Sequence, residues 1–336
     1  MSSNHKKVYD ADDVAIHAYL LRRGELVFAL SEKQNFSLKG ENIIFGAAEV
    51  LFGLENNTMD TRHISVYAVG DSEIVKVPNA NLKKFITLYN VGYNITRVVA
   101  RSVQKTNETI SALNESLTRT NNPAKKFYTQ YHDTIADIEA GNRDRGDERL
   151  AAFIKLKKNT LAYRKGSLFT TRVKKIQRIM GRQIDDYKSE FPEGSILCKQ
   201  NDAASDLFML NKGQIRVLLG DEEVACIDEP GTIFGEMSLF LNEPRSATLI
   251  AGKKSLVTVI GRENLNGIAE RMPDFFLRIT TTLWSRFKNN VEMIHEMETI
   301  KPDSAKNDIR SLRNALVVLM KSERIFWLKK YIDELQ

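Results

Sequence analysis

The chain has 336 residues, of which 42% are hydrophobic and 27% are charged, and it contains 18 glycines and 7 prolines. This composition excludes a disordered or fibrous chain and predicts a globular protein of two or three domains. The 49 lysines and arginines exceed the 43 aspartates and glutamates, and the resulting net charge of +6 identifies no class of partner by itself.

The first region, residues 1–80, alternates short apolar runs with polar turns. The runs cover residues 14–16, 25–29, 42–45, 64–69 and 73–77. Runs of this length, separated by turn residues, are typical of antiparallel strands. We therefore expect a small β jelly-roll domain at the start of the chain.

In the second region, residues 81–186, the apolar spacing changes to steps of three and four residues. From Asn81 to Leu117 these steps predict one long helix with an apolar stripe. Asn122-Pro123 offers a cap and a first-turn proline for a second helix, and Asp147 can cap a third. This region is expected to be a helical connecting domain.

The third region, residues 187–290, returns to the β pattern with stronger punctuation by turn residues. Its strand candidates are residues 195–198, 206–210, 214–219, 223–227, 247–250 and 256–260. Even, short strands of this kind predict a second small jelly roll. The last region, 291–336, is helical in pattern, so the predicted fold class is α+β: two small β jelly-roll domains separated by a helical segment, with C-terminal helices.

Several classes of protein lose support because their sequence signals are missing. The longest apolar run, residues 315–320, is far shorter than the roughly 18 residues of a membrane span. No apolar segment follows Lys6-Lys7, so we expect no secretory signal and a cytoplasmic location. Cys198 and Cys226 form no close pair and have no histidine at ligand spacing, so we expect no disulfide framework and no metal site.

The familiar motifs of enzymes are also missing from the sequence. It contains no GxxxxGK[ST] phosphate loop, no GxGxxG fingerprint, no HExxH pair and no nucleophile elbow. Its five histidines are scattered over segments of different type. We therefore predict a protein that is not an enzyme and has no catalytic residues.

One segment of the third region, residues 231–249, breaks the strand pattern and brings chemistry together. Gly235 allows a close backbone approach, and the amides that follow it open a short helix, where an anion is favoured. Ten residues later comes Arg245, whose planar fork matches two phosphate oxygens, with small Ser246 and Ala247 after it. Glu236 fits this place if it accepts a hydrogen bond from a sugar hydroxyl. The segment thus predicts a site for a ligand with a phosphate close to a ribose hydroxyl.

Phe234-Gly235-Glu236 and the run from Pro244 to Thr248 resemble the phosphate-binding cassette of the cyclic nucleotide-binding domain family. The resemblance covers about residues 187–290 and implies a cyclic nucleotide as ligand. It implies that Arg245 holds the cyclic phosphate and that Glu236 holds the ribose 2′-hydroxyl. It also implies that the backbone amides near Met237, Ser238 and Ala247 donate to phosphate oxygens. On a looser alignment, the resemblance places Val217 and Cys226 on the base side.

The first region resembles a degenerate copy of the same family. Phe45-Gly46-Ala47 begins like a cassette, and Arg62 could stand at its far end. The residue after the glycine is Ala47 rather than a carboxylate, although Glu49 is near. Bulky His63 and Ile64 follow the arginine, and the interval from glycine to arginine is 16 residues instead of 10. We therefore expect no ligand in this copy, and a packing or docking role.

The leading function is a non-enzymatic receptor in which a bound cyclic nucleotide shifts a helix that contacts an unidentified protein partner. In the family the mobile part is the helix after the barrel, which offers Phe276, Leu277 and Trp284 as lid residues. Ser246 resembles the adenine-binding pattern of the family, whereas members that favour guanine commonly carry threonine there. We therefore expect cAMP to be preferred over cGMP.

Two other functions stay open at this point. The alternative is a DNA-binding transcription regulator that resembles the catabolite activator protein; however, residues 301–336 contain no glycine for the tight turn of a helix-turn-helix, so sequence-specific binding of nucleic acid is not expected. A third possibility, suggested by the tandem domain order, is a regulatory subunit of a kinase. The stretch 155–182 carries ten lysines or arginines and no carboxylate, which fits a solvated helix face or contact with an acidic partner.

Overall fold

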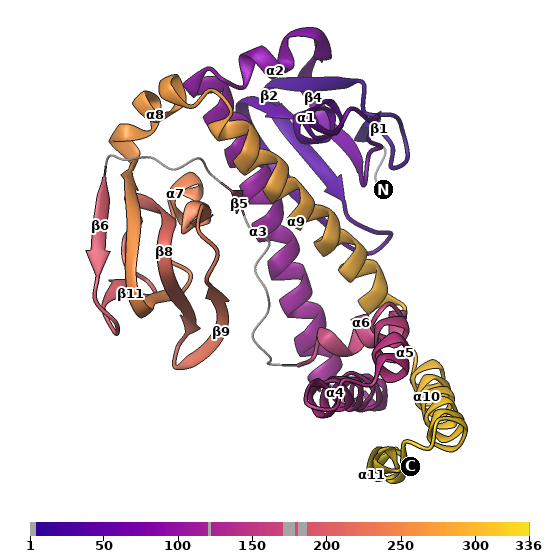
Figure 1. Ribbon diagram of the computed structural model, residues 1–336. Helices are drawn as coiled ribbons and strands as arrows, with labels where there is room; N and C mark the ends of the chain where they lie inside the picture. The colour runs from indigo at the N-terminus through magenta and orange to yellow at the C-terminus, as the bar shows by residue number, and fades with distance from the viewer. Residues whose placement is uncertain (1–4, 120–121, 171–178, 181–186, 336) are drawn as a thin grey trace. The chain divides into compact units, whose positions relative to one another are not determined.

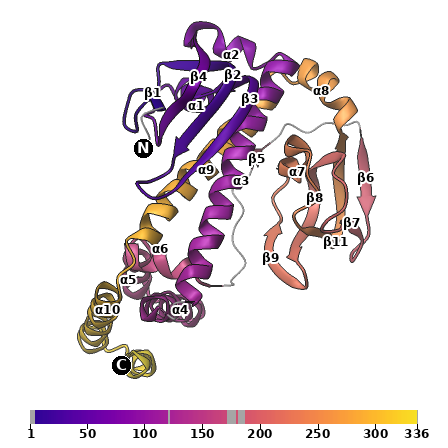
Figure 2. The same cartoon turned by 180° about the vertical axis from the view of Figure 1, so that it is seen from behind.

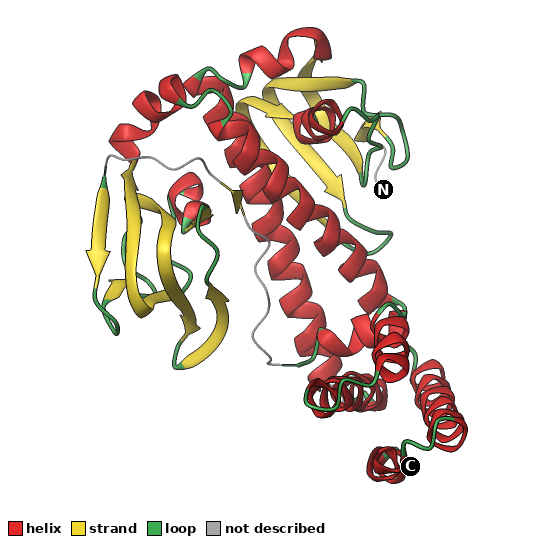
Figure 3. Ribbon diagram, viewed as in Figure 1, coloured by secondary structure: helices red, strands yellow, loops and turns green. Residues whose placement is uncertain are grey.

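The computed structural model describes residues 5–119, 122–170, 179–180 and 187–335. The chain divides into two compact units, which are treated separately below. The first unit combines residues 1–108 with 172–292, and the second combines residues 109–171 with 293–336. Figure 3 shows that the strands lie in two sheets and that most of the remaining chain is helical. The observed mixture of helices and antiparallel sheets confirms the predicted fold class.

The first sheet of the first unit is antiparallel, with strand order β1-β4-β2-β3. Figure 1 labels β1, β2 and β4, and Figure 2 also labels β3. Its strands are β1 (His5–Tyr9), β2 (His17–Ala29), β3 (Asn35–Phe45) and β4 (Ser65–Pro78). The two runs predicted at 64–69 and 73–77 belong to one continuous strand, β4. Between them Gly70 adopts a positive φ of 54° and the pairing register with β2 shifts, so the strand continues through an irregularity instead of ending in a turn. The sequence did not predict helix α1 (Ala47–Asn56), which lies between β3 and β4.

Helices of the first unit follow each sheet. After β4 come η1 (Asn79–Asn81), α2 (Leu82–Phe85) and α3 (Tyr89–Arg119), so the single helix predicted from Asn81 is interrupted between Phe85 and Tyr89. α9 (Phe275–Glu298) packs against α3 where the buried hydroxyls of Thr96 and Thr280 lie 2.8 Å apart. This hydrogen bond satisfies two buried polar groups at the helix contact.

The second sheet of the first unit has seven strands, with a main path β5-β10-β8-β11-β6. Its elements are β5 (Ile179–Met180), β6 (Lys188–Phe191), β7 (Ile196–Cys198), β8 (Asp206–Leu219), β9 (Glu222–Ile227), β10 (Thr232–Phe234), α7 (Glu236–Leu241) and β11 (Thr248–Gly261), followed by η2 (Arg262–Asn264) and α8 (Leu265–Arg271). β9 pairs with β8, and β7, labelled in Figure 2, pairs with β11. Phe208, Leu210, Ile215 and Val257 lie in its apolar core.

The second unit is helical and has its own core. Its helices include α4 (Pro123–Arg143), α5 (Glu148–Lys158), α6 (Leu161–Ser167), α10 (Pro302–Ser322), η3 (Phe326–Leu328) and α11 (Lys329–Glu334). The predicted caps of two helices form: the Asn122 side chain accepts a hydrogen bond from the Ala124 amide, and Asp147 accepts from the amides of Arg149 and Leu150. Residues from both helical regions of the sequence share the core, since Ile135 of α4 and Leu312 of α10 are each 0% exposed in one cluster.

The basic stretch 155–182 is only partly described. Residues 155–170 lie in α5, in α6 and in the segments beside them, whereas 171–178 and 181–182 fall outside the described residues. No helix in the described ranges has the length and apolar character needed to cross a membrane. The described residues also include no group of three or more His, Cys, Asp or Glu side chains placed to hold a metal ion.

Candidate functional site

The turn between β10 and α7 forms one wall of the candidate site. Gly235 has a φ of 73° and stands at the N-cap of α7 without a side-chain cap. A Cβ atom at this position would lie 2.9 Å from Nη1 of Arg245, closer than a carbon atom tolerates. Glycine is therefore required here for both its backbone conformation and the close approach of the arginine.

Arg245 is the central cation of the site, and its side chain is buried. Nη1 donates to the Gly235 carbonyl oxygen at 3.0 Å, and Nη2 donates to the Asp206 carbonyl oxygen at 2.7 Å. The guanidinium carbon lies 4.9 Å from the centre of the Phe208 ring. Nε is buried and has no hydrogen-bond partner among the described residues. Among the described residues, the buried positive charge thus has only backbone carbonyls and the Phe208 ring as partners, and its Nε donor remains unused.

Glu236, the first residue of α7, is the carboxylate of the site. It is 3% exposed, and its Oε1 lies 2.6 Å from Nη1 of Arg286 on α9. The Arg286 side chain is 19% exposed and lines the cavity beside Glu236. The two charged groups at the site therefore have different surroundings: Glu236 has a cationic partner, and Arg245 has no anionic one within the described part of the chain.

A cavity of about 140 Å³ lies between these groups. Its lining consists of Val217, Ile227, Phe234, Gly235, Glu236, Met237, Ser238, Arg245, Ser246, Ala247, Leu249 and Arg286. Nine of the ten residues predicted from the sequence are in this lining. The lining combines three charged side chains, those of Glu236, Arg245 and Arg286, with apolar ones.

Cys226 is the predicted site residue that does not line the cavity. It pairs with Arg216 in the β8–β9 ladder, whereas its neighbours Ala225 and Ile227 are the buried positions of β9. Because successive side chains of a strand point to opposite faces, Ile227 faces the cavity and Cys226 faces away. Burial raises the pKa of the Cys226 thiol above its ordinary value.

Sequence reasoning missed three lining residues, Ile227, Leu249 and Arg286. The sequence pattern pointed to the right strand but to the wrong face, since a one-residue shift of the strand register replaces Cys226 by Ile227. Arg286 carries no local signal, because it lies 50 residues after Glu236 and meets it only through the packing of α9. The three proposed lid residues are buried elsewhere on α9: Phe276 is 1%, Leu277 7% and Trp284 4% exposed.

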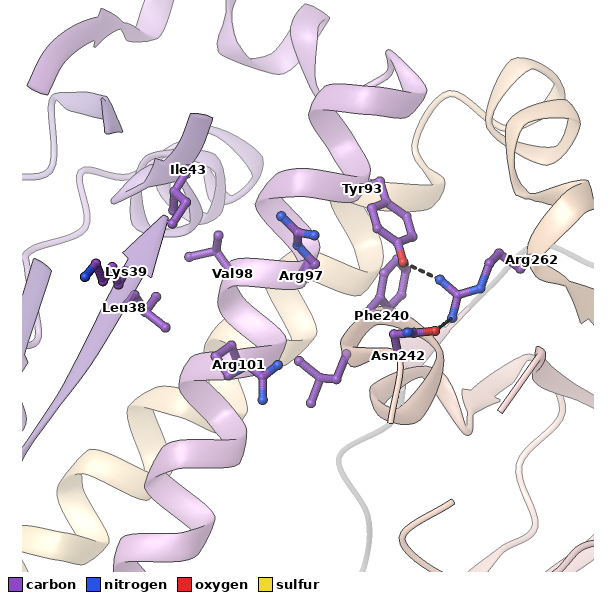
Figure 4. A pocket seen from close by; sticks show the side chains of 11 residues that line it. Leu38, Lys39, Ile43, Tyr93, Arg97, Val98, Arg101, Phe240, Asn242 and Arg262 are labelled. Atoms are coloured by element: carbon purple, nitrogen blue, oxygen red, sulfur yellow. Dashed lines mark hydrogen bonds between the residues drawn. The ribbon is translucent and has the colours of Figure 1, made fainter. Parts of the chain in front are cut away.

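A second, larger groove of about 510 Å³ lies beside α3 and α7 (Figure 4). Two of its three arginines bond to neighbouring groups: Arg262 donates to the Tyr93 hydroxyl at 2.7 Å, and Arg101 lies 2.5 Å from Glu243. The groove lacks the buried, unused donor that distinguishes the cavity at Arg245. We therefore take the smaller cavity as the candidate functional site.

Comparison with known proteins agrees with this choice. Residues 188–272 match the family model of the cyclic nucleotide-binding domain. The chain is 40% identical over 76 residues to a cGMP-dependent protein kinase of Plasmodium berghei, which is 23% of this chain and 9% of the kinase. It is 26% identical over 123 residues to the cyclic AMP receptor protein of Thermus thermophilus, which is 35% of this chain and 56% of the receptor. The matched segments span less than two thirds of either relative.

Among solved structures, the Thermus thermophilus catabolite activator protein is similar over 40% of this chain and 62% of its own, with 24% sequence identity and a TM-score of 0.28. A TM-score this low establishes no common overall arrangement. The family match therefore concerns one quarter of the sequence, the β domain that carries the Arg245 cavity, and it confirms the predicted resemblance for that domain.

Proposed function

Starting from the membership of residues 188–272 in the cyclic nucleotide-binding domain family, we propose that this chain is a non-enzymatic receptor for a cyclic nucleotide, with cAMP preferred over cGMP. In this proposal the ligand binds in the cavity between α7 and β11, and its binding changes the contacts of α9. The changed helix controls a protein partner whose identity is open.

The observation that carries the proposal is the buried guanidinium of Arg245. Its side chain is 4% exposed, and no carboxylate of the described residues pairs with it. A buried cation without a counter-charge is costly, and a phosphate anion would remove that cost while engaging the unused Nε. The residues present thus fit a cyclic phosphate. The backbone amides at the start of α7 add donors on the same side of the cavity.

Glu236 and Arg286 define the sugar side of the proposed site. Arg286 already occupies Oε1 of Glu236, so a ribose 2′-hydroxyl can bind the carboxylate either by donating to Oε2 or by displacing Arg286. The cavity volume of about 140 Å³ also lies below the roughly 300–1,000 Å³ of typical ligand sites. We infer that a whole nucleotide enters only when Arg286 gives way, and this links ligand binding to α9.

The base side of the proposed site is apolar. Val217, Ile227 and Leu249 supply aliphatic surface to the cavity lining. Such surface suits the faces of a purine ring, and Ile227 takes the place that the sequence assigned to Cys226. Ser246 offers a hydroxyl beside Arg245, and a single neutral hydrogen bond contributes about 0.5–1.5 kcal/mol. The preference for cAMP is therefore expected to be several-fold to tenfold.

The proposal is tested by comparing cAMP with adenosine, which keeps the base and sugar but lacks the phosphate. Competition binding to the full chain should place adenosine at least about 100-fold weaker, because it leaves Arg245 without an anion. Equal affinity for the two ligands would contradict the role of Arg245. Affinity capture of partners with and without cAMP then tests the regulatory output, which requires a protein whose retention depends on the nucleotide.

A further inference from the structure

The N-terminal sheet repeats the strand pairing of the candidate site. Tyr19 on β2 pairs with Phe45 on β3, as Phe208 on β8 pairs with Phe234 on β10. In both pairs the ring centres are 5.4 Å apart. Directly after each phenylalanine comes a glycine with positive φ that caps a helix, Gly46 at 62° before α1 and Gly235 at 73° before α7.

The same repetition holds at the opposite end of each sheet. The amide of Glu25 donates to Ser72 Oγ at 3.0 Å, and the amide of Gln214 donates to Ser255 Oγ at 3.0 Å. The hydroxyl of each serine also donates to the carbonyl of the same residue, at 3.1 Å in both places. The two sheets therefore correspond along their length, and positions in one can be assigned to positions in the other.

Arg62 occupies the place of Arg245 in the N-terminal sheet. Its Nη1 donates to the Gly46 carbonyl oxygen at 2.8 Å, and its Nη2 donates to the carbonyl oxygen of His17 at the start of β2. A Cβ atom at Gly46 would lie 2.9 Å from Arg62 Nη1, the same distance as between Gly235 and Arg245. The guanidinium carbon lies 4.3 Å from the centre of the Tyr9 ring. We call this set of contacts, two backbone carbonyls and an aromatic ring around a buried guanidinium, an arginine cradle. Arg62 and Arg245 each lie in one.

Only the arginine cradle of Arg62 contains an anion within the described part of the chain. Glu49 Oε1 lies 3.0 Å from Arg62 Nη1, and the two side chains are 4% and 2% exposed. Burial and, after it, the negative charge of Glu49 raise the pKa of Tyr9 well above its ordinary value. Arg62 therefore has a buried carboxylate from its own chain, whereas Arg245 has no counter-charge among the described residues.

The helix position of the glutamate explains this difference. Glu49 is the third residue of α1, and the third residue of α7 is Ser238, which lines the Arg245 cavity. Glu236 is instead the first residue of α7, where α1 has Ala47. Two positions along a helix rotate a side chain by about 200°, so the glutamate faces the arginine in one domain and α9 in the other.

We propose that Glu49 is the permanent internal ligand of a second arginine cradle, in which its carboxylate takes the place beside Arg62 that an external anion takes beside Arg245. The N-terminal domain therefore binds no cyclic nucleotide, and its cradle accepts a small external oxyanion once the Glu49 carboxylate is removed. The comparison with Arg245 rests on the proposed function, whereas the Arg62 cradle stands on its own contacts.

The first test removes the carboxylate and returns it in solution. In the full chain, Glu49→Ala leaves Arg62 as a buried cation without an anionic partner, a change that strongly destabilises a fold. We expect amide hydrogen exchange in β2–β4 to accelerate at least tenfold. Sodium formate, a free carboxylate small enough for the vacated space, should reverse this change with a saturable dose response, and sodium chloride at equal ionic strength should not. Folding of the variant only in formate would support the proposal equally.

Two control variants separate charge from shape. Glu49→Gln keeps the size of the side chain and fills the space, so it should accelerate exchange but show no response to formate. The double variant Glu49→Ala, Arg62→Ala removes the cation and should also lose the formate response. A formate effect of the same size in the wild-type chain and in all variants, or unchanged exchange in Glu49→Ala, would overturn the proposal.

The reciprocal substitution transfers the internal ligand to the other domain. Ser238→Glu should weaken cAMP binding at least a hundredfold while its Tm stays above that of Ser238→Gln, because only the charged side chain pairs with Arg245. Unchanged binding by Ser238→Glu would show that the two helix positions are not equivalent and would overturn the proposal. If the wild-type chain itself binds no cAMP, the proposed function fails, and the formate experiment still decides the role of Glu49.

Discussion

The carboxylate of Glu236 lies 2.6 Å from the guanidinium of Arg286, although the two residues are 50 positions apart in the chain. Glu236 opens α7 inside the segment that matches the cyclic nucleotide-binding domain model, and Arg286 belongs to α9, which follows that segment. The proposed ligand needs the same carboxylate for its ribose hydroxyl. In the proposed function, this ion pair is therefore the contact through which a nucleotide and α9 compete.

Replacing Arg286 tests that competition. In Arg286→Ala the Glu236 carboxylate is free of its competitor, so we expect cAMP to bind about three- to tenfold more tightly, as suits the loss of one partly exposed ion pair. Arg286→Lys keeps a positive charge and should change the affinity less. Weaker binding in Arg286→Ala would mean that Arg286 contacts the ligand itself. Calorimetric titration of the two variants measures both effects.

Replacing Arg245 tests the phosphate contact. Arg245→Lys keeps the charge but loses the planar fork, so binding should weaken by about 1.5–3 kcal/mol, which is roughly a factor of 10 to 150. Arg216 on β8 provides a matched control, because it is exposed, pairs with Glu223 and points away from the cavity. Arg216→Lys should bind cAMP like the wild type. Losses of equal size in both variants would point to a general effect on the domain.

The ribose contact is tested with an analogue. Glu236→Ala should weaken cAMP but have little effect on the analogue that lacks the 2′-hydroxyl, because that analogue makes no bond to the carboxylate. A fluorescence competition assay gives the four affinities, and their ratios form a thermodynamic cycle. Equal losses for the two ligands would remove Glu236 from the sugar site.

The base preference is tested at Ser246, which follows Arg245 and lines the cavity. Ser246→Thr keeps the hydroxyl and adds a methyl group that restricts its rotamers. We expect the variant to bind cGMP several-fold more tightly than the wild type does, with cAMP affinity nearly unchanged. If the ratio of the two affinities does not move, contacts elsewhere in the cavity decide the base preference.

The site residues that lie close together in the sequence could be predicted, and those brought together only by tertiary packing could not. Gly235, Glu236 and Arg245 lie within ten residues of sequence, so their spacing alone indicated a shared site. Arg286 could not be found in this way, because its contact with Glu236 depends on how α9 packs against the domain. Cys226 was assigned instead of Ile227 because a strand register cannot be fixed to one residue from the sequence pattern.

The N-terminal domain illustrates the same limit. The sequence indicated that its cassette lacks a carboxylate directly after Gly46, and it noted Glu49 nearby. It could not indicate that Glu49 and Arg62 form a buried pair, because α1 was not predicted as a helix and the facing side chains depend on its rotation. That the N-terminal copy holds no ligand stays a prediction of the sequence, and the buried Glu49–Arg62 pair offers a physical reason for it.

The most direct test of the account is the number of cAMP molecules that one full chain binds. Isothermal titration calorimetry of cAMP should give one site per chain, since Arg245 has no anionic partner in the described ranges and Arg62 has Glu49. Arg245→Ala should abolish the heat of binding, and Glu49→Gln should leave the single site intact. Two equivalent sites in the wild-type chain, or a site that survives Arg245→Ala, would contradict the account.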